Sequence, residues 1–249
     1  MARAREDLSY AEQRRTEEAW RRSSAGKARR RRFRRRRRRF LVVVIAALVV
    51  IAFAIRGAIG TSDQYPSPSA SALADLDLRQ RIVAIANSQV GYRTQPVDSY
   101  CNKFSAYWDA GTANCPAGET SEEWCADFAA WVWRIAGVHF VYGYSKNEIN
   151  GAVVSFYEWG VANGLWHPLS SGYVASPGDV AIYGLSRGSN PSAVHAAIVT
   201  SDKPRARGPD VVNGDGDRTG FSVVEVAVDQ ELAEADQRGS TLDGYVSPT

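Results

Sequence analysis

A run of arginines that leads directly into an uncharged apolar stretch divides the chain. Residues 34–39 are six consecutive arginines, and residues 40–55 carry no charged side chain. Continued past Arg56 to Ile59, the stretch is 20 residues long. At about 1.5 Å rise per residue, such a helix covers the roughly 30 Å core of a bilayer. The sequence therefore predicts one transmembrane signal-anchor helix over residues 40–59.

The two sides of this stretch differ sharply in charge. Residues 1–39 hold 17 Lys and Arg against 5 Asp and Glu, whereas residues 57–249 hold 12 against 22. Because the positive flank of a membrane helix stays in the cytoplasm, residues 1–39 are expected to be a cytoplasmic tail. The remainder is then extracytoplasmic, in a single-pass protein of the plasma membrane. The arginine tract of residues 34–39 adjoins the apolar stretch, so its expected partner is anionic lipid. No nucleic acid is expected to bind.

Two other export routes fit the same residues. Small residues near Ala54 resemble a cleavage site, which would release the C-terminal part as a secreted protein. Residues 37–41 resemble a twin-arginine export signal. Residues 60–73 are rich in Ser, Pro and Ala and predict a flexible linker, followed by one globular domain over residues 74–249.

The pattern of apolar residues changes from helical to extended along this domain. The segment LRQRIVAIANSQVGY, residues 78–92, has apolar residues at helical spacing with Gly91 as a stop, and a helix is also expected after a cap at Ser145. After Pro177 the runs GDVAIYG, AVHAAIVT, DVVNGD and FSVVEVAV are short and β-rich. Helices first and strands later predict an α+β domain, with the helices packed on an antiparallel sheet.

Three cysteines leave one thiol over once a disulfide forms. Cys101 and Cys115 share a segment with little regular structure, and an exported protein can join them. Cys125 lies in SEEWCADFAAWVW, residues 121–133, which predicts a helix that ends at Gly137. The alternatives for Cys125 are a buried inert thiol or a disulfide with Cys115.

Several features favour a reactive Cys125. Thr120 or Ser121 can cap the helix, and the dipole and free N–H groups of its first turn stabilise a thiolate. The carboxylates of Glu122 and Glu123 oppose this, so both are expected to point into solvent.

A histidine is needed to take the thiol proton. His195 lies on a strand face in AVHAAIVT, whereas His139 and His167 lie in loops. A Cys at a helix start that faces a His on a sheet is the arrangement of Cys–His hydrolases. A third residue should orient the imidazole, and VVNGD on the next strand offers Asn213 and Asp215.

In chain order, EEWCADFAAWVWRIAGV, SPGDVAIYG, VHAAIVT and VVNGD resemble the CHAP family of cysteine, histidine-dependent amidohydrolases and peptidases. The resemblance implies a papain-like α+β fold and cleavage of an amide bond in peptidoglycan, by an N-acetylmuramoyl-L-alanine amidase or a peptide endopeptidase. Cys125 matches the family nucleophile and His195 its base.

The resemblance leaves the third residue open. A common family pattern has Glu-Gly-Asn where this chain has Asn213-Gly214-Asp215, and we favour Asn213 over Asp215 as the orienting residue. The oxyanion is expected to bind the Cys125 N–H and Asn102. No cofactor is expected. No metal is expected either, because the acidic residues before Cys125 are too few and too far apart for the calcium loop of some relatives.

The predicted mechanism begins with a thiolate–imidazolium pair formed by Cys125 and His195, followed by attack on a peptidoglycan amide. The alternative function is a catalytically inactive, membrane-anchored module that binds or assembles the wall.

Overall fold

The computed structural model describes residues 14–16, 18–19, 65–97, 99–201, 208–216, 222–228 and 240–249. The chain divides into two compact units, residues 1–59 and 60–249. In the first unit the described residues, 14–16 and 18–19, are helical. The basic tract and its expected contact with lipid lie outside the described residues.

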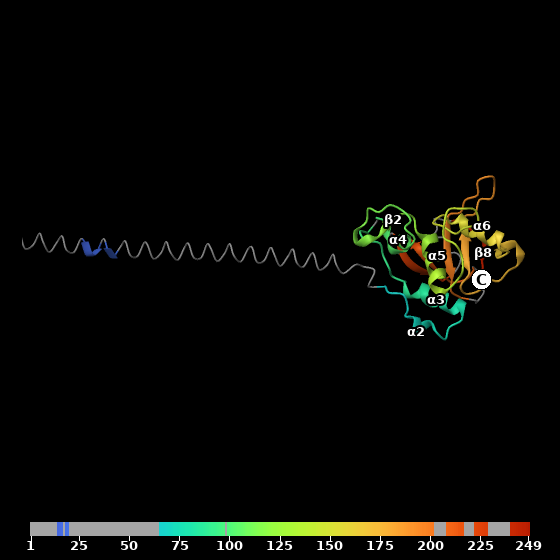
Figure 1. Ribbon diagram of the computed structural model, residues 1–249, viewed down its shortest axis with the longest axis horizontal. Helices are drawn as coiled ribbons and strands as arrows, with labels where there is room; N and C mark the ends of the chain where they lie inside the picture. Colours follow the sequence, from blue (N-terminus) through green and yellow to red (C-terminus); the bar gives the residue numbers. More distant parts are fainter. Residues whose placement is uncertain are drawn as a thin grey trace, which may run out of the picture. The chain divides into compact units, whose positions relative to one another are not determined.

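The second unit is an α+β domain whose helices are short (Figure 1). Asp77 and Gln80 form a capping box at the start of the first long helix, which fixes where that helix begins. Gly137 ends the helix of Cys125 with φ of 100°, a left-handed conformation that favours glycine. The described α-helices of this unit are α2 (Ala70–Leu73), α3 (Leu78–Ser88), α4 (Lys103–Tyr107), α5 (Cys125–Ala136) and α6 (Val154–Ala162).

Six strands form one sheet in which every neighbouring pair is antiparallel, in the order β3-β8-β4-β5-β6-β7. The central strands β4 and β5 pair from Val180 with Ile198 to Tyr183 with His195. A separate two-stranded sheet joins β1 (Cys101–Asn102) to β2 (Thr120–Ser121). The strands of the large sheet are β3 (Trp166–Pro168), β4 (Val180–Tyr183), β5 (His195–Val199), β6 (Val211–Gly216), β7 (Val223–Ala227) and β8 (Leu242–Val246).

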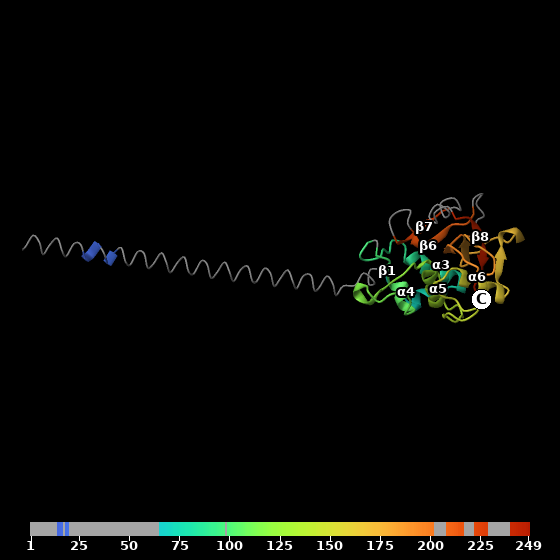
Figure 2. The ribbon, with the colours of Figure 1, turned by 90° about the horizontal axis from the view of Figure 1, so that it is seen from above.

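Both faces of the large sheet are apolar, and the helices cover one of them. Helices α3 and α5 contact each other and β5, and α5 also contacts β6. Figure 2 shows α4 and α5 on the same side of β6 and β7. Ala196 and Ile198 face this layer together with Cys125, whereas Ala197 and Tyr183 belong to the core on the other face. The start of α5 is thereby placed against the middle of the sheet.

The structure does not support one element of the predicted fold, the transmembrane helix. Of the helices in the described part of the chain, none has the length and apolar character needed to cross a membrane. Residues 40–59, where that helix was expected, lie outside the described residues. The fold that the structure supports is an α+β domain with a six-stranded antiparallel sheet.

Two helix starts differ from the predicted ones. The Glu148 carboxylate does accept the Ser145 N–H at 2.9 Å, but only a turn follows, and α6 begins at Val154. Thr120 and Ser121 do not cap α5, because they form β2. The N-cap of α5 is Trp124, which contributes no capping side chain.

The structure joins Cys101 to Cys115 in a disulfide, as expected, and leaves Cys125 as a buried free thiol. The bridge ties β1 to the segment that leads into β2. Because the bridge joins residues that lie 14 positions apart, the entropy model gives it about 3 kcal/mol of stabilisation.

Candidate active site

Cys125 is the first residue of α5 and is 6% exposed. As the first helical residue, its N–H has no partner within the helix, so this group is available to an acceptor. The backbone amides of Ala196 and Ala126 lie close enough to the sulfur to favour its ionised form. The thiol therefore faces the backbone of β5 at the residue that follows His195.

His195 begins β5, and its ring is held from the neighbouring strand β6. The Nε2 atom lies 3.3 Å from Oδ1 of Asn213, and both residues are buried. Since a carbonyl oxygen only accepts, Nε2 must carry the hydrogen and Nδ1 the lone pair. Nδ1 is thus the ring nitrogen that can receive a proton from a thiol.

The Cys125 thiol meets the backbone of β5 at Ala196, whereas the His195 ring lies on the side of Tyr183. Among the described residues, Cys125 Sγ and the His195 ring share no hydrogen bond. The ring lies instead beside Tyr183, at 6.2 Å between centroids. Catalytic hydrogen bonds are often long in the absence of substrate.

Burial keeps both groups neutral. Burial raises the pKa of the Cys125 thiol to about 12, and the Asp215 carboxylate adds to the effect. Burial also lowers the pKa of His195 to about 3, against a smaller opposing effect of its hydrogen bond to Asn213. The charged pair predicted from the sequence is therefore disfavoured in this state, because desolvation penalises both charged forms.

Asp215 lies on the same strand as Asn213 but binds a different partner. Its Oδ2 accepts the backbone N–H of Trp124 at 3.2 Å, and its Oδ1 accepts the Ser222 hydroxyl at 2.9 Å. The Ser222 oxygen in turn accepts the indole N–H of Trp124 at 2.7 Å. Asp215 thus holds the residue before the cysteine, and the orienting contact to His195 is made by Asn213.

Gly214 permits this close approach of β6 to α5. A Cβ atom at position 214 would lie 2.5 Å from the Cβ of Phe128, a distance that side chains do not adopt. The glycine between Asn213 and Asp215 thereby lets β6 pack closely against the beginning of α5.

The structure gives Asn102 a different role from the predicted oxyanion donor. Its Oδ1 accepts the Ser105 N–H at 2.7 Å, which makes it the N-cap of α4. Its Nδ2 donates to the carbonyl oxygens of Tyr100 at 3.0 Å and Thr120 at 3.4 Å. The amide group is committed to the contacts of α4 and of the small sheet.

A second carboxyl group near Cys125 was missed by the sequence reading. Asp127 is fully buried in the first turn of α5, where Oδ2 accepts the Ser105 hydroxyl at 2.6 Å and Oδ1 accepts the Tyr142 hydroxyl at 2.5 Å. Glu122 does not point into solvent as expected, because it is half-buried beside Asp127. Burial raises the pKa of Glu122 to about 8, and Asp127 adds to the effect.

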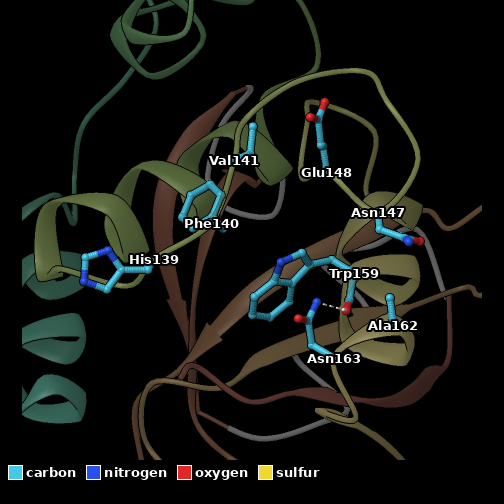
Figure 3. Close-up of a pocket in the computed structure, with 8 residues that line it drawn as sticks. All are labelled: His139, Phe140, Val141, Asn147, Glu148, Trp159, Ala162 and Asn163. Carbon is cyan, nitrogen blue, oxygen red and sulfur yellow. Dashed lines mark hydrogen bonds between the residues drawn. The ribbon is translucent and has the colours of Figure 1, made fainter.

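The other two histidines lie away from Cys125. His139 lines a pocket of about 590 Å³ just past the carboxyl end of α5, where Figure 3 shows it with Phe140, Trp159 and Asn163. Cys125 lies at the opposite end of this helix. His167 stacks on Tyr173 at 3.8 Å between ring centroids. Neither histidine competes with His195 as the base.

No family model, curated protein or solved structure matches the chain. In the described part of the chain, no three His, Cys, Asp or Glu side chains gather as metal ligands. The site is defined by its own geometry, a thiol at a helix start beside a strand that carries an amide-oriented imidazole.

Proposed function

We propose that the protein is a CHAP-like peptidoglycan hydrolase that cleaves an amide bond, with Cys125 as nucleophile and His195 as base. The observation that carries the proposal is the placement of Cys125 at the start of α5 against the backbone that follows His195, with the imidazole held by Asn213. The order of these residues along the chain is also that of the motifs that resemble the family.

The chemistry follows from the two neutral groups. Nδ1 of His195 takes the thiol proton as the sulfur bonds to the amide carbonyl carbon, so charge forms only in the presence of substrate. The Cys125 N–H stabilises the oxyanion. His195 then returns the proton to the leaving amine as the C–N bond breaks, and water hydrolyses the remaining thioester.

The disulfide supports an extracytoplasmic location for the domain. Disulfides persist in oxidising compartments and are rare in the cytosol. Peptidoglycan, the proposed substrate, lies in such a compartment.

The test is lysis of purified peptidoglycan by the full chain, followed by mass spectrometry of the products. Cys125→Ala and His195→Ala should each abolish most of the release of soluble fragments, because the two groups act as one unit. The fragments will show whether the bond is muramoyl–L-alanine or one within the peptide. Lysis by folded Cys125→Ala at the wild-type rate would rule out the proposed nucleophile.

One observation favours a second function, an inactive module that binds the wall. Cys125 and His195 are 6% and 4% exposed, and the two share no hydrogen bond, so the site is closed in this state. An inactive module would sediment with insoluble peptidoglycan but release no fragments. Its Cys125 would also resist iodoacetamide in the folded protein while reacting after denaturation.

A further inference from the structure

Asp215, Trp124 and Ser222 form a closed ring of hydrogen bonds at the start of α5. The carboxylate of Asp215 accepts from the Trp124 backbone and from the Ser222 hydroxyl, and Ser222 accepts from the indole of Trp124. Trp124 is fully buried, and its indole ring stacks on Phe104 at 5.2 Å between ring centroids. These hydrogen bonds therefore tie Trp124, the buried residue directly before Cys125, to β6.

The backbone of β6 is shaped to present this carboxylate. Asp215 has φ of 58°, in the left-handed region that few residues other than glycine adopt, and the pairing of β6 with β7 shifts register between Asn213 and Gly216. Such bulges re-aim a side chain. Here the bulge lets Asn213 reach His195 while Asp215, two residues later, reaches the nucleophile helix.

The same carboxylate places a negative charge beside the thiol. A negative charge at a helix start is favourable for the helix, yet it repels a thiolate formed on the first helical residue. The charged groups that act on Cys125 are Asp215 from β6 and Asp127 from its own helix, and the titratable group on β5 is His195. Asp215 is the larger of the two acidic influences.

We propose that Asp215 is a positioning residue that fixes Cys125 through Trp124, and that its charge restrains the thiol from ionising in the free protein. This inference concerns the regulation of the site and rests on the proposed cysteine hydrolase function. It replaces the orienting role that the sequence allowed for Asp215. Position and charge are separate contributions, and different substitutions remove them.

Asp215→Asn removes the charge and preserves the shape. The amide oxygen can still accept the Trp124 N–H, and the amide nitrogen can donate to Ser222. We expect the thiolate fraction of Cys125 at a given alkaline pH to rise about tenfold, as loss of one neighbouring charge implies. Ser222→Ala breaks the ring but keeps the charge, so it should lower the melting temperature without this gain in thiolate.

The experiment is a pH titration of thiolate absorbance near 240 nm in the full-length protein, with the titration of Cys125→Ala subtracted. Circular dichroism at each pH confirms that the variants remain folded. Asp243→Asn is the matched control, because its carboxylate also accepts a backbone N–H, that of Leu185 at 2.7 Å, in another part of the fold. It should leave the titration unchanged.

The outcomes are decisive without any assay of hydrolysis. The proposal is supported if Cys125 ionises at a lower pH in Asp215→Asn but not in Ser222→Ala or Asp243→Asn. This holds even if the protein proves inactive on peptidoglycan. Identical titration of wild type and Asp215→Asn, including no ionisation of either before alkaline unfolding, overturns it. An equal gain in Ser222→Ala also overturns it, because loosening of the helix start would then explain the effect.

Discussion

His195 and Asn213 meet across neighbouring strands, with the imidazole Nε2 3.3 Å from the amide Oδ1. This contact selects the tautomer, since a hydrogen on Nε2 leaves the lone pair on Nδ1. It also raises the pKa of His195 against the larger lowering effect of burial. Asn213 therefore sets the direction of the proposed base and offsets part of the basicity that burial removes.

Asn213→Ala should reduce the rate of peptidoglycan lysis by about tenfold or more, because the ring loses its orienting acceptor. The initial rate of turbidity loss, measured with the full chain, gives the comparison. Asn163→Ala, an exposed amide in the pocket of Figure 3, is the matched control and should lyse at the wild-type rate. Unchanged lysis by folded Asn213→Ala would contradict the orienting role.

Protonation of His195 should destabilise the fold in acid. Its pKa is about 3 when folded and 6.5 in its ordinary state, so between these values the unfolded chain binds the extra proton. Stability then rises with pH across this window. The free energy of unfolding of the wild type should gain about 2 kcal/mol more than that of His195→Gln between pH 5 and pH 7.

Urea unfolding at the two pH values measures this difference. His139→Gln, at an exposed position, provides the control and should retain the wild-type response. If His195→Gln responded to pH as the wild type does, the imidazole would not be held neutral by burial.

The elements that the sequence predicted well are those with local signals. Helix α3 has its capping box within four residues, and α5 ends at a glycine that takes a left-handed conformation. Strands β4 to β7 coincide with the four β-rich runs after Pro177. The pairing of Cys101 with Cys115 followed from their place in one irregular segment.

The rest depends on contacts between distant segments. The acceptor for the start of α5 is Asp215, 91 residues from Trp124, so the local pattern suggested Thr120 or Ser121 instead. The burial of Glu122 likewise depends on how Asp127 packs, which no spacing reveals. Asn102 could not be placed either, because its partners come from both α4 and β2.

Glu122→Gln should stabilise the protein at pH 8 but not at pH 4.5. Folded Glu122 keeps its proton up to a pKa of about 8, because of burial and of Asp127, whereas the unfolded group ionises near 4.5. Between these values the folded state binds more protons, so the wild type loses stability as pH rises. Glutamine removes this loss.

The melting temperature at the two pH values tests this. The gain from Glu122→Gln should grow between pH 4.5 and pH 8, while Glu123→Gln, at the exposed neighbouring position, should show no such trend. A gain that is equal at both pH values would mean that the Glu122 carboxyl is not held protonated.

The buried Asp179 carboxylate should contribute strongly to the stability of the domain. It is fully buried, and its Oδ1 receives the Arg79 guanidinium at 2.8 Å. Its Oδ2 accepts the Tyr173 hydroxyl and the Ser176 N–H, both at 2.8 Å. These contacts join α3, the turn before β4 and the loop after β3.

Asp179→Ala should therefore lower the free energy of unfolding by about 3 kcal/mol, since it leaves the Arg79 guanidinium and two hydrogen-bond donors without their acceptor. Chemical denaturation at pH 7 measures the loss. Glu123→Ala is the control, because it removes an equal charge from an exposed position and should change stability by less than about 0.5 kcal/mol. Arg79→Ala should cost less than Asp179→Ala, because the Arg79 side chain is 35% exposed and the carboxylate would keep its two other donors. If Arg79→Ala cost more stability than Asp179→Ala, the ion pair would contribute more to stability than the buried hydrogen bonds of Asp179.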